Sequence, residues 1–169
     1  NFENPNFKLV SVNTARFDTT KHLATSVISD AKIGLQQISD ALGDWRAPNT
    51  WYQRAIKERD EWDAYVEKQS GPTNQEEPSY AHAVGAVYRN SDPSDIVVTA
   101  AGGLVGEVVQ VWKPKQLNTF ETEWGFSCMG YEISGALGIK MAKPDQDVVV
   151  FVGDGSYLLN NSDIYSSVL

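Results

Sequence analysis

The 169-residue sequence has one cysteine and no long apolar run, and each shortage excludes a class of protein. Because Cys128 is the only cysteine, no internal disulfide bond can form, which is typical of a protein from a reducing compartment. No apolar stretch approaches the roughly 20 residues that cross a bilayer, and no signal-peptide pattern is visible. We therefore expect a globular, cytoplasmic protein with no membrane partner.

Basic residues are also scarce, with 14 Lys and Arg against 22 Asp and Glu and a formal net charge of −8. This balance argues against a general nucleic-acid-binding protein, because the phosphate backbone of nucleic acids attracts a basic surface. It does not exclude a small anionic ligand, since backbone N–H groups and a metal ion can hold one.

The first part of the sequence predicts the end of an α/β domain. Two short strands, 7–13 and 24–28, precede a helix with apolar residues at helical spacing. Ser29 or Asp30 can cap this helix at its start, and Gly43 follows its last periodic residue.

Residues 44–78 differ in composition from both flanks. Pro48 lies near their start, a dense run of charges covers 57–61, and Gly71-Pro72 leads into a polar loop. We interpret this segment as an interdomain connector that contains one surface helix. Four of its residues share a face that we expect to lean against a neighbouring element: Trp51, Ala55, Trp62 and Val66.

From Ser79 onward, helix and strand patterns alternate. Ser79 is expected to cap a first helix. The predicted strands are 95–103 and 147–155, and the predicted helices that follow are 104–112, 127–142 and 156–169. Because the strands are continuous apolar runs, the pattern predicts an α/β fold with a parallel sheet that helices cover on both faces.

The two ends of the chain carry no terminal signals, since a strand pattern begins almost at once and a helical pattern runs into Leu169 without a cap. We expect an internal fragment, truncated at both ends. Residues 1–43 would be the C-terminal part of a central domain, 44–78 the connector, and 79–169 the N-terminal part of a further α/β domain.

Two of the predicted strands end in glycine-rich turns, 101–103 and 153–156. Ligands of open parallel sheets bind at this edge, where glycines admit a phosphate and helix N-termini offer N–H donors. Mg²⁺ prefers oxygen ligands and bridges to phosphates, so Asp154 is predicted to bind Mg²⁺ beside a diphosphate at Gly155 and Ser156. The alternative is an ordinary turn in which Asp154 is the N-cap of the next helix.

The run "VVVFVGDGSYLLNNSDIYSSV" resembles the first half of the cofactor motif of thiamine-diphosphate-dependent enzymes, in which Gly-Asp-Gly follows a strand. The resemblance implies thiamine diphosphate and Mg²⁺ as cofactors and Asp154 as a metal ligand. In that family an asparagine one helix and one strand later supplies the second ligand, which would lie beyond Leu169. Asn160 and Asn161 come too early for this role, and we expect them on a helix surface or at a subunit contact.

Two further segments carry the resemblance. "EWGFSCMGYEISGALGIKMA" (123–142) is similar to the segment that places a bulky apolar residue under the cofactor, and Met129 is the matching position, although a methionine can also simply fill a core. "DIVVTAAGGLVGEV" (95–108) implies backbone contacts to the diphosphate. The implied cofactor-binding residues are Gly102, Gly103, Leu104, Val105, Met129, Gly153, Gly155 and Ser156.

The same segments, with "FKLVSVNTARFDTTKH" and "SDAKIGLQQISDALGDW", resemble most the branch of this family that hydrolyses a C–C bond of trihydroxycyclohexane-1,2-dione to 5-deoxyglucuronate in inositol catabolism. That branch implies a cyclic dione substrate and a full-length homodimer or homotetramer. The family's activating glutamate lies on an N-terminal domain. We therefore assign no catalytic residue to this chain, and none of Glu121, Glu123 and Glu132 takes that role.

Two other functions stay open. One is an acetolactate-synthase-like enzyme or decarboxylase with the same cofactor, and the other is a non-catalytic α/β module that binds nucleotide or assembles subunits. An NAD site is disfavoured, because no Gly-x-Gly-x-x-Gly follows a strand. For His82 we expect a structural role at the solvent edge, and for Cys128 a packing role rather than a nucleophilic one, while His22 lies far in sequence from the glycine turns.

Overall fold

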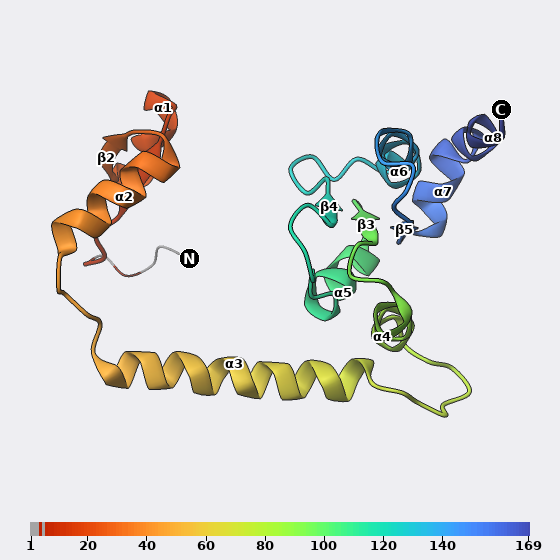
Figure 1. Ribbon diagram of the computed structural model, residues 1–169, viewed down its shortest axis with the longest axis horizontal. Coiled ribbons are helices and arrows are strands. Elements are labelled where there is room, and N and C mark those ends of the chain that lie inside the picture. The colour runs from red at the N-terminus through yellow and green to blue at the C-terminus, as the bar shows by residue number, and fades with distance from the viewer. Residues whose placement is uncertain (1–3, 5) are drawn as a thin grey trace. The chain divides into compact units, whose positions relative to one another are not determined.

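The computed structural model describes residue 4 and residues 6–169, and the chain divides into two compact units, 1–54 and 55–169 (Figure 1). The domain limits expected from the sequence, at 43 and 78, are not tested by this division and stay predictions. None of the helices in the described part of the chain is long and apolar enough to span a membrane.

The first unit contains a small parallel sheet and the helix expected after it. Its elements are β1 (Val10–Asn13), α1 (Arg16–Thr19), the 3-10 helix η1 (Lys21–Leu23), β2 (Thr25–Ile28) and α2 (Ala31–Leu42). β1 and β2 pair in parallel, with Val10 opposite Thr25. Of the two candidate caps it is Asp30 that starts α2, because its carboxylate accepts the N–H groups of Lys32 and Ile33. The sequence patterns did not predict α1 or η1, which contains His22.

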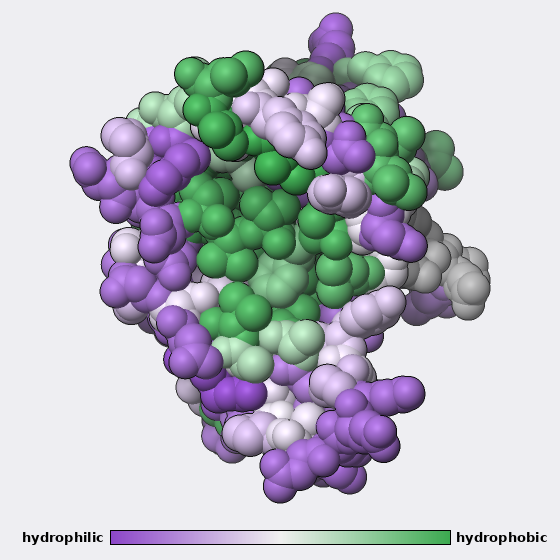
Figure 2. Space-filling model, turned by 90° about the vertical axis from the view of Figure 1, so that its right-hand side faces the viewer, coloured by the Kyte–Doolittle hydropathy of each residue, from purple (hydrophilic) through white to green (hydrophobic). Residues whose placement is uncertain are grey.

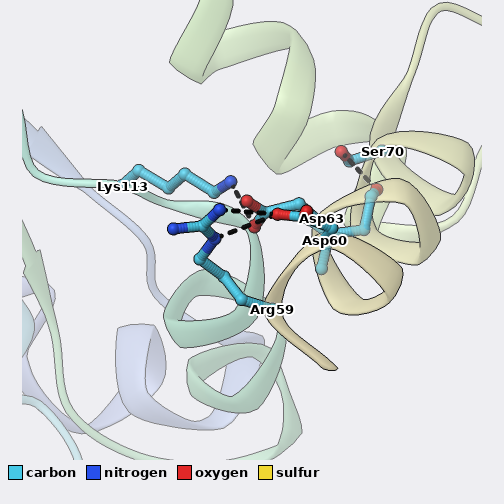
Figure 3. A network of polar contacts seen from close by, with 6 residues as sticks. Arg59, Asp60, Asp63, Ser70 and Lys113 are labelled. Atoms are coloured by element: carbon cyan, nitrogen blue, oxygen red, sulfur yellow. Dashed lines mark hydrogen bonds and ion pairs between the residues drawn. The ribbon is translucent and has the colours of Figure 1, made fainter. Parts of the chain in front are cut away.

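The connector helix, α3 (Asn49–Ser70), is 22 residues long. Of its four expected contact residues only Val66 is buried; Trp51, Ala55 and Trp62 are exposed, so the expected apolar contact face is wrong for these three. A salt bridge of 2.7 Å from Lys113 Nζ to Asp63 Oδ1 attaches the last turns of α3 to the segment after α5, beside the Arg59–Asp60 pair (Figure 3).

The second unit is built on a parallel sheet with the strand order β4-β3-β5. Its strands are β3 (Ile96–Thr99), β4 (Phe120–Thr122) and β5 (Val148–Val150). The central strand β3 is fully buried, since Ile96, Val97 and Val98 are at most 1% exposed. The parallel fold is thus confirmed. β4 was missed, because three residues with glutamate in the middle carry no apolar run.

Helices cover both faces of this sheet, as Figure 1 shows. The helices are α4 (Tyr80–Asn90), α5 (Gly103–Val111), α6 (Tyr131–Ala142), α7 (Asp154–Asn160) and α8 (Ser162–Val168). On one face, α4, α5 and Val66 of α3 enclose a core with Val97 of β3. On the other face α6 packs on β3 and β5, and α7 and α8 pack on α6.

Two of the predicted helices differ from the structure by more than one residue. The helix expected over 127–142 begins only at Tyr131, because Gly130, with φ of +94°, forms a turn before it. The single helix expected over 156–169 starts two residues earlier, at Asp154, and is two short helices that meet at Asn161.

His82 has the structural role expected for it. Ser79 caps α4, and its hydroxyl accepts the N–H of His82, while Nδ1 of the His82 ring accepts the N–H of Ser79 at 3.2 Å. The expected helix start at Ser79 is confirmed by this reciprocal pair.

The hydroxyls of Thr99 and Thr122 generate a testable prediction. These residues are register partners at the ends of β3 and β4, and both hydroxyls are buried without a hydrogen-bond partner. Because an unsatisfied buried hydroxyl is costly, Thr99→Val should leave the free energy of unfolding unchanged or raise it by about 1 kcal/mol. Chemical denaturation followed by tryptophan fluorescence measures this.

The matched control is Val98→Thr, which places a hydroxyl at the adjacent, fully buried position. It should lower the free energy of unfolding by about 1–3 kcal/mol. A loss of similar size in Thr99→Val would show that the native hydroxyl has a hydrogen-bond partner after all.

Candidate functional site

The parallel pairing of β3 and β5 brings their carboxyl ends to the same edge of the sheet. The turn after β3 and the turn after β5 therefore lie side by side and line one pocket of about 560 Å³. The lining residues are Tyr80, Ala101, Gly102, Gly103, Leu104, Met129, Val152, Gly153, Asp154, Gly155 and Ser156.

All of the predicted cofactor and metal residues except Val105 are in this pocket lining. Val105 is buried in α5, so its contact to a diphosphate stays a prediction that concerns its backbone alone. The sequence patterns missed Tyr80, Ala101 and Val152. Ala101 and Val152 directly precede the glycine turns and could have been included, whereas no local signal places the first residue of α4 at this site.

The N-terminus of α5 forms one wall of the pocket. Gly102, with φ of +83°, is its N-cap and has no side chain to cap the first N–H groups. These donors and the positive end of the helix dipole are thus available to an anion. A Cβ at Gly102 or Gly103 would meet no heavy atom within 4 Å apart from the adjoining backbone, so the space directly above this turn is open.

Asp154 contributes the one carboxylate of the lining. It is the first residue of α7, and Gly153 is the N-cap, so the alternative that Asp154 is the N-cap of its helix is wrong. Its side chain is exposed, and Oδ1 accepts the N–H of Gly155 at 2.9 Å. Among the described residues no group of three or more His, Cys, Asp and Glu side chains could hold a metal, so Asp154 is not part of such a group.

Met129 lines the pocket beside the second glycine turn. It is half exposed, so it does not fill the core. A Cβ at Gly155 would approach its Cε to 2.9 Å, so the end of the methionine side chain lies directly against this glycine. Met129 therefore presents an apolar surface to the pocket next to the carboxylate.

A glutamate organises the loop that leads to Met129. Glu123 accepts the N–H of Phe126 through Oε1 and that of Cys128 through Oε2. The Cys128 and Phe126 N–H groups lower the pKa of the Glu123 carboxyl below its ordinary value. Cys128 is exposed rather than packed, which corrects the expected packing role. Desolvation and the nearby charge of Glu123 raise the pKa of its thiol, which opposes a nucleophilic role.

Asn160 has a different place from the one expected. It lies in α7, as predicted, but its side chain is half-buried and its Nδ2 donates to the carbonyl oxygen of Gly130 at 3.2 Å. It is therefore an internal contact between α7 and the turn before α6. Asn161 follows at the junction of α7 and α8.

A second pocket, of about 600 Å³, lies beside the outer edge of β5 and is mostly apolar. It is lined by Ile133, Ala136, Leu137, Lys140, Asp147, Val148, Val150, Val152, Tyr157, Ile164 and Ser167. Figure 2, from the side on which α7 and α8 lie in Figure 1, shows a broad apolar area in green. The lining contains one ion pair, Lys140 with Asp147 at 3.6 Å, and no glycine turn, so the glycine-lined pocket is the better candidate for chemistry.

Comparison with family models identifies one related family. Residues 100–168 match the family model of the thiamine pyrophosphate enzyme, C-terminal TPP binding domain. This segment contains both glycine turns, Met129 and Asp154.

Curated relatives match nearly the whole chain. A 3D-(3,5/4)-trihydroxycyclohexane-1,2-dione hydrolase from Geobacillus thermodenitrificans is 33% identical over 95% of this chain and 28% of its own length. Proteins of the same name from Clostridium tetani (33% identical, 99% of this chain, 30% of the relative) and Listeria innocua (34%, 98% and 30%) are also similar. The chain thus spans less than a third of the length of these relatives. These matches confirm the resemblance to thiamine-diphosphate-dependent enzymes found in the sequence.

The surroundings of Cys128 generate a prediction on thiol reactivity. Because its pKa is raised, the thiol should stay protonated at neutral pH, and alkylation by iodoacetamide should have a midpoint above the pH of an ordinary cysteine. Glu123→Gln removes the negative charge and should lower this midpoint. The rate of alkylation as a function of pH measures both, and Cys128 is the only thiol of the chain.

Glu121→Gln, an exposed change of the same charge outside this loop, is the control and should leave the midpoint unchanged. Fast alkylation of the unaltered chain at pH 7 would contradict the assignment, since it would mean a stabilised thiolate.

Proposed function

Starting from the match of residues 100–168 to thiamine pyrophosphate-binding domains, we propose that this chain is part of a thiamine-diphosphate- and Mg²⁺-dependent hydrolase. Its reaction would be the cleavage of a C–C bond of trihydroxycyclohexane-1,2-dione to 5-deoxyglucuronate, as the names of the curated relatives and the sequence resemblance suggest. The observation that carries the proposal is the pocket in which two glycine turns, one carboxylate and one methionine meet.

The pocket residues fit the two cofactors by their chemistry. The N–H groups at the start of α5 are donors for a diphosphate, and the glycines leave room for it. Asp154 is an exposed carboxylate that would hold Mg²⁺ against the same phosphates. Met129 would pack against an aromatic ring of the cofactor and exclude water there.

When bound, thiamine diphosphate supplies the carbon nucleophile and the electron sink for C–C cleavage. The work of this chain is to bind and orient the cofactor, and we assign no proton transfer to its residues. The activating glutamate, the second metal ligand and the contacts to the cyclic dione would come from outside residues 1–169, in a homodimer or homotetramer.

Assay of the full-length protein with the cyclic dione and, separately, with pyruvate tests the substrate assignment. We expect ring opening that depends on thiamine diphosphate and Mg²⁺, and no turnover of pyruvate. The 169-residue chain alone should be inactive with both, because the activating glutamate of the family belongs to another domain. Turnover of pyruvate but not of the dione would instead support an acetolactate-synthase-like enzyme or a decarboxylase.

Asp154→Ala in the full-length protein tests the metal ligand. Loss of a direct ligand should weaken Mg²⁺-dependent binding of thiamine diphosphate by more than the ~10–100-fold that loss of an outer partner costs. Quenching of tryptophan fluorescence on titration with the cofactor, with and without Mg²⁺, measures this.

Asp145→Ala is the control, since Asp145 is an exposed carboxylate in the turn between α6 and β5. It should bind the cofactor like the unaltered protein. Unchanged affinity in Asp154→Ala would refute the assigned metal site.

A further inference from the structure

Glu132 is a carboxylate that is completely buried, with 0% of its surface exposed. Both of its oxygens accept backbone N–H groups: Oε1 that of Ala101 at 3.1 Å, and Oε2 that of Gly130 at 3.0 Å. Burial of a carboxylate is costly unless its oxygens are hydrogen-bonded. These two N–H groups meet that requirement, so the side chain is held in one place.

The two partners of Glu132 belong to two different walls of the glycine-lined pocket. Ala101 directly precedes Gly102 and Gly103 at the start of α5, and Gly130 directly follows Met129. Glu132 itself is not among the residues that line the pocket. The packing of α6 on β3 brings these two turns together, and the carboxylate of Glu132 bridges them through its two oxygens.

A second side chain holds the turn at Gly130, and it comes from the wall of the pocket that α7 forms. Asn160, in the helix that begins at Asp154, donates to the carbonyl oxygen of Gly130 at 3.2 Å. A Cβ at Gly130 would lie 2.9 Å from Cβ of Asn160, so the two segments are in close contact. The peptide groups on both sides of Gly130 are therefore fixed, one by Glu132 and the other by Asn160.

We propose that Glu132 is a positioning residue of the cofactor pocket. It holds the Gly102-Gly103 turn and Met129 at a fixed distance from each other without touching the cofactor. This inference rests on the proposed function. Its physical basis is that the diphosphate-binding N–H groups and the apolar surface of Met129 must contact one bound molecule at the same time, which requires a fixed distance between them. The role of Glu132 is thus to hold the backbone of the pocket walls in place.

Glu132→Gln in the full-length protein tests the inference, because the amide keeps the shape but turns a donor toward one of the two N–H groups. We expect amide hydrogen exchange at Ala101 or Gly130 to become at least about tenfold faster in the protein without cofactor. The dissociation constant for thiamine diphosphate should rise by about tenfold or more. At saturating cofactor, kcat should fall while the KM for substrate changes little, and the near-ultraviolet circular dichroism of the bound cofactor should change.

Glu121→Gln is the matched control, since it removes the same charge from an exposed position on β4. It should alter none of these quantities. Asn160→Ala provides a second variant should Glu132→Gln fold poorly. It should weaken cofactor binding in the same direction, and the double variant should be non-additive because both side chains act through Gly130.

The outcomes separate the two proposals. Absence of thiamine diphosphate binding in the unaltered protein would overturn the proposed function, and the positioning role with it. Cofactor binding in the unaltered protein, with unchanged affinity, kcat and dichroism in Glu132→Gln and Asn160→Ala, would overturn the positioning role alone. A lowered thermal midpoint of Glu132→Gln with unchanged affinity, kcat and dichroism would also overturn the positioning role, because Glu132 would then only stabilise the core.

Discussion

The parallel pairing of β3 with β4 and β5 is the constraint on which the second unit depends. β3 lies in the middle, and its residues Ile96, Val97 and Val98 are removed from water on both faces. A strand whose side chains are apolar on both faces is typical of the middle of a parallel sheet covered by helices. The parallel pairing in turn decides that the turns after β3 and β5 open at the same edge, where helices α5 and α7 begin.

The site at this edge depends on small residues and on a few buried polar contacts. Glycines keep the space above the start of α5 open and let Met129 approach Gly155. Glu132 and Asn160 join the three segments that surround this space, through the backbone of Ala101 and Gly130. A pocket that is mostly backbone can bind a phosphorylated cofactor without basic side chains, which agrees with the acidic composition of the chain.

Local patterns predicted those features whose cause is local. The apolar strand at 148–150, the capped starts of α2 and α4 and the glycine turns are each specified by a few adjacent residues. The predictions failed where neighbours in space decide. β4 is a strand because it pairs with β3, although its sequence contains a glutamate, and most of the face expected on α3 is exposed. No glycine or proline lies at the break between α7 and α8 at Asn161, so no local pattern predicts this break.

The sequence by itself determined the type of fold, the two glycine turns and the carboxylate between two glycines, because strand burial, turn chemistry and metal preference are properties of residues close together in the chain. It also carried the resemblance to thiamine-diphosphate-dependent enzymes, which the comparisons confirmed. Only the tertiary structure decided that Tyr80 joins the pocket, that Val105 points into the core and that Glu132 connects two of the walls. These contacts join residues far apart in the chain. They form only when the sheet has brought the strand ends together, so no local pattern can predict them.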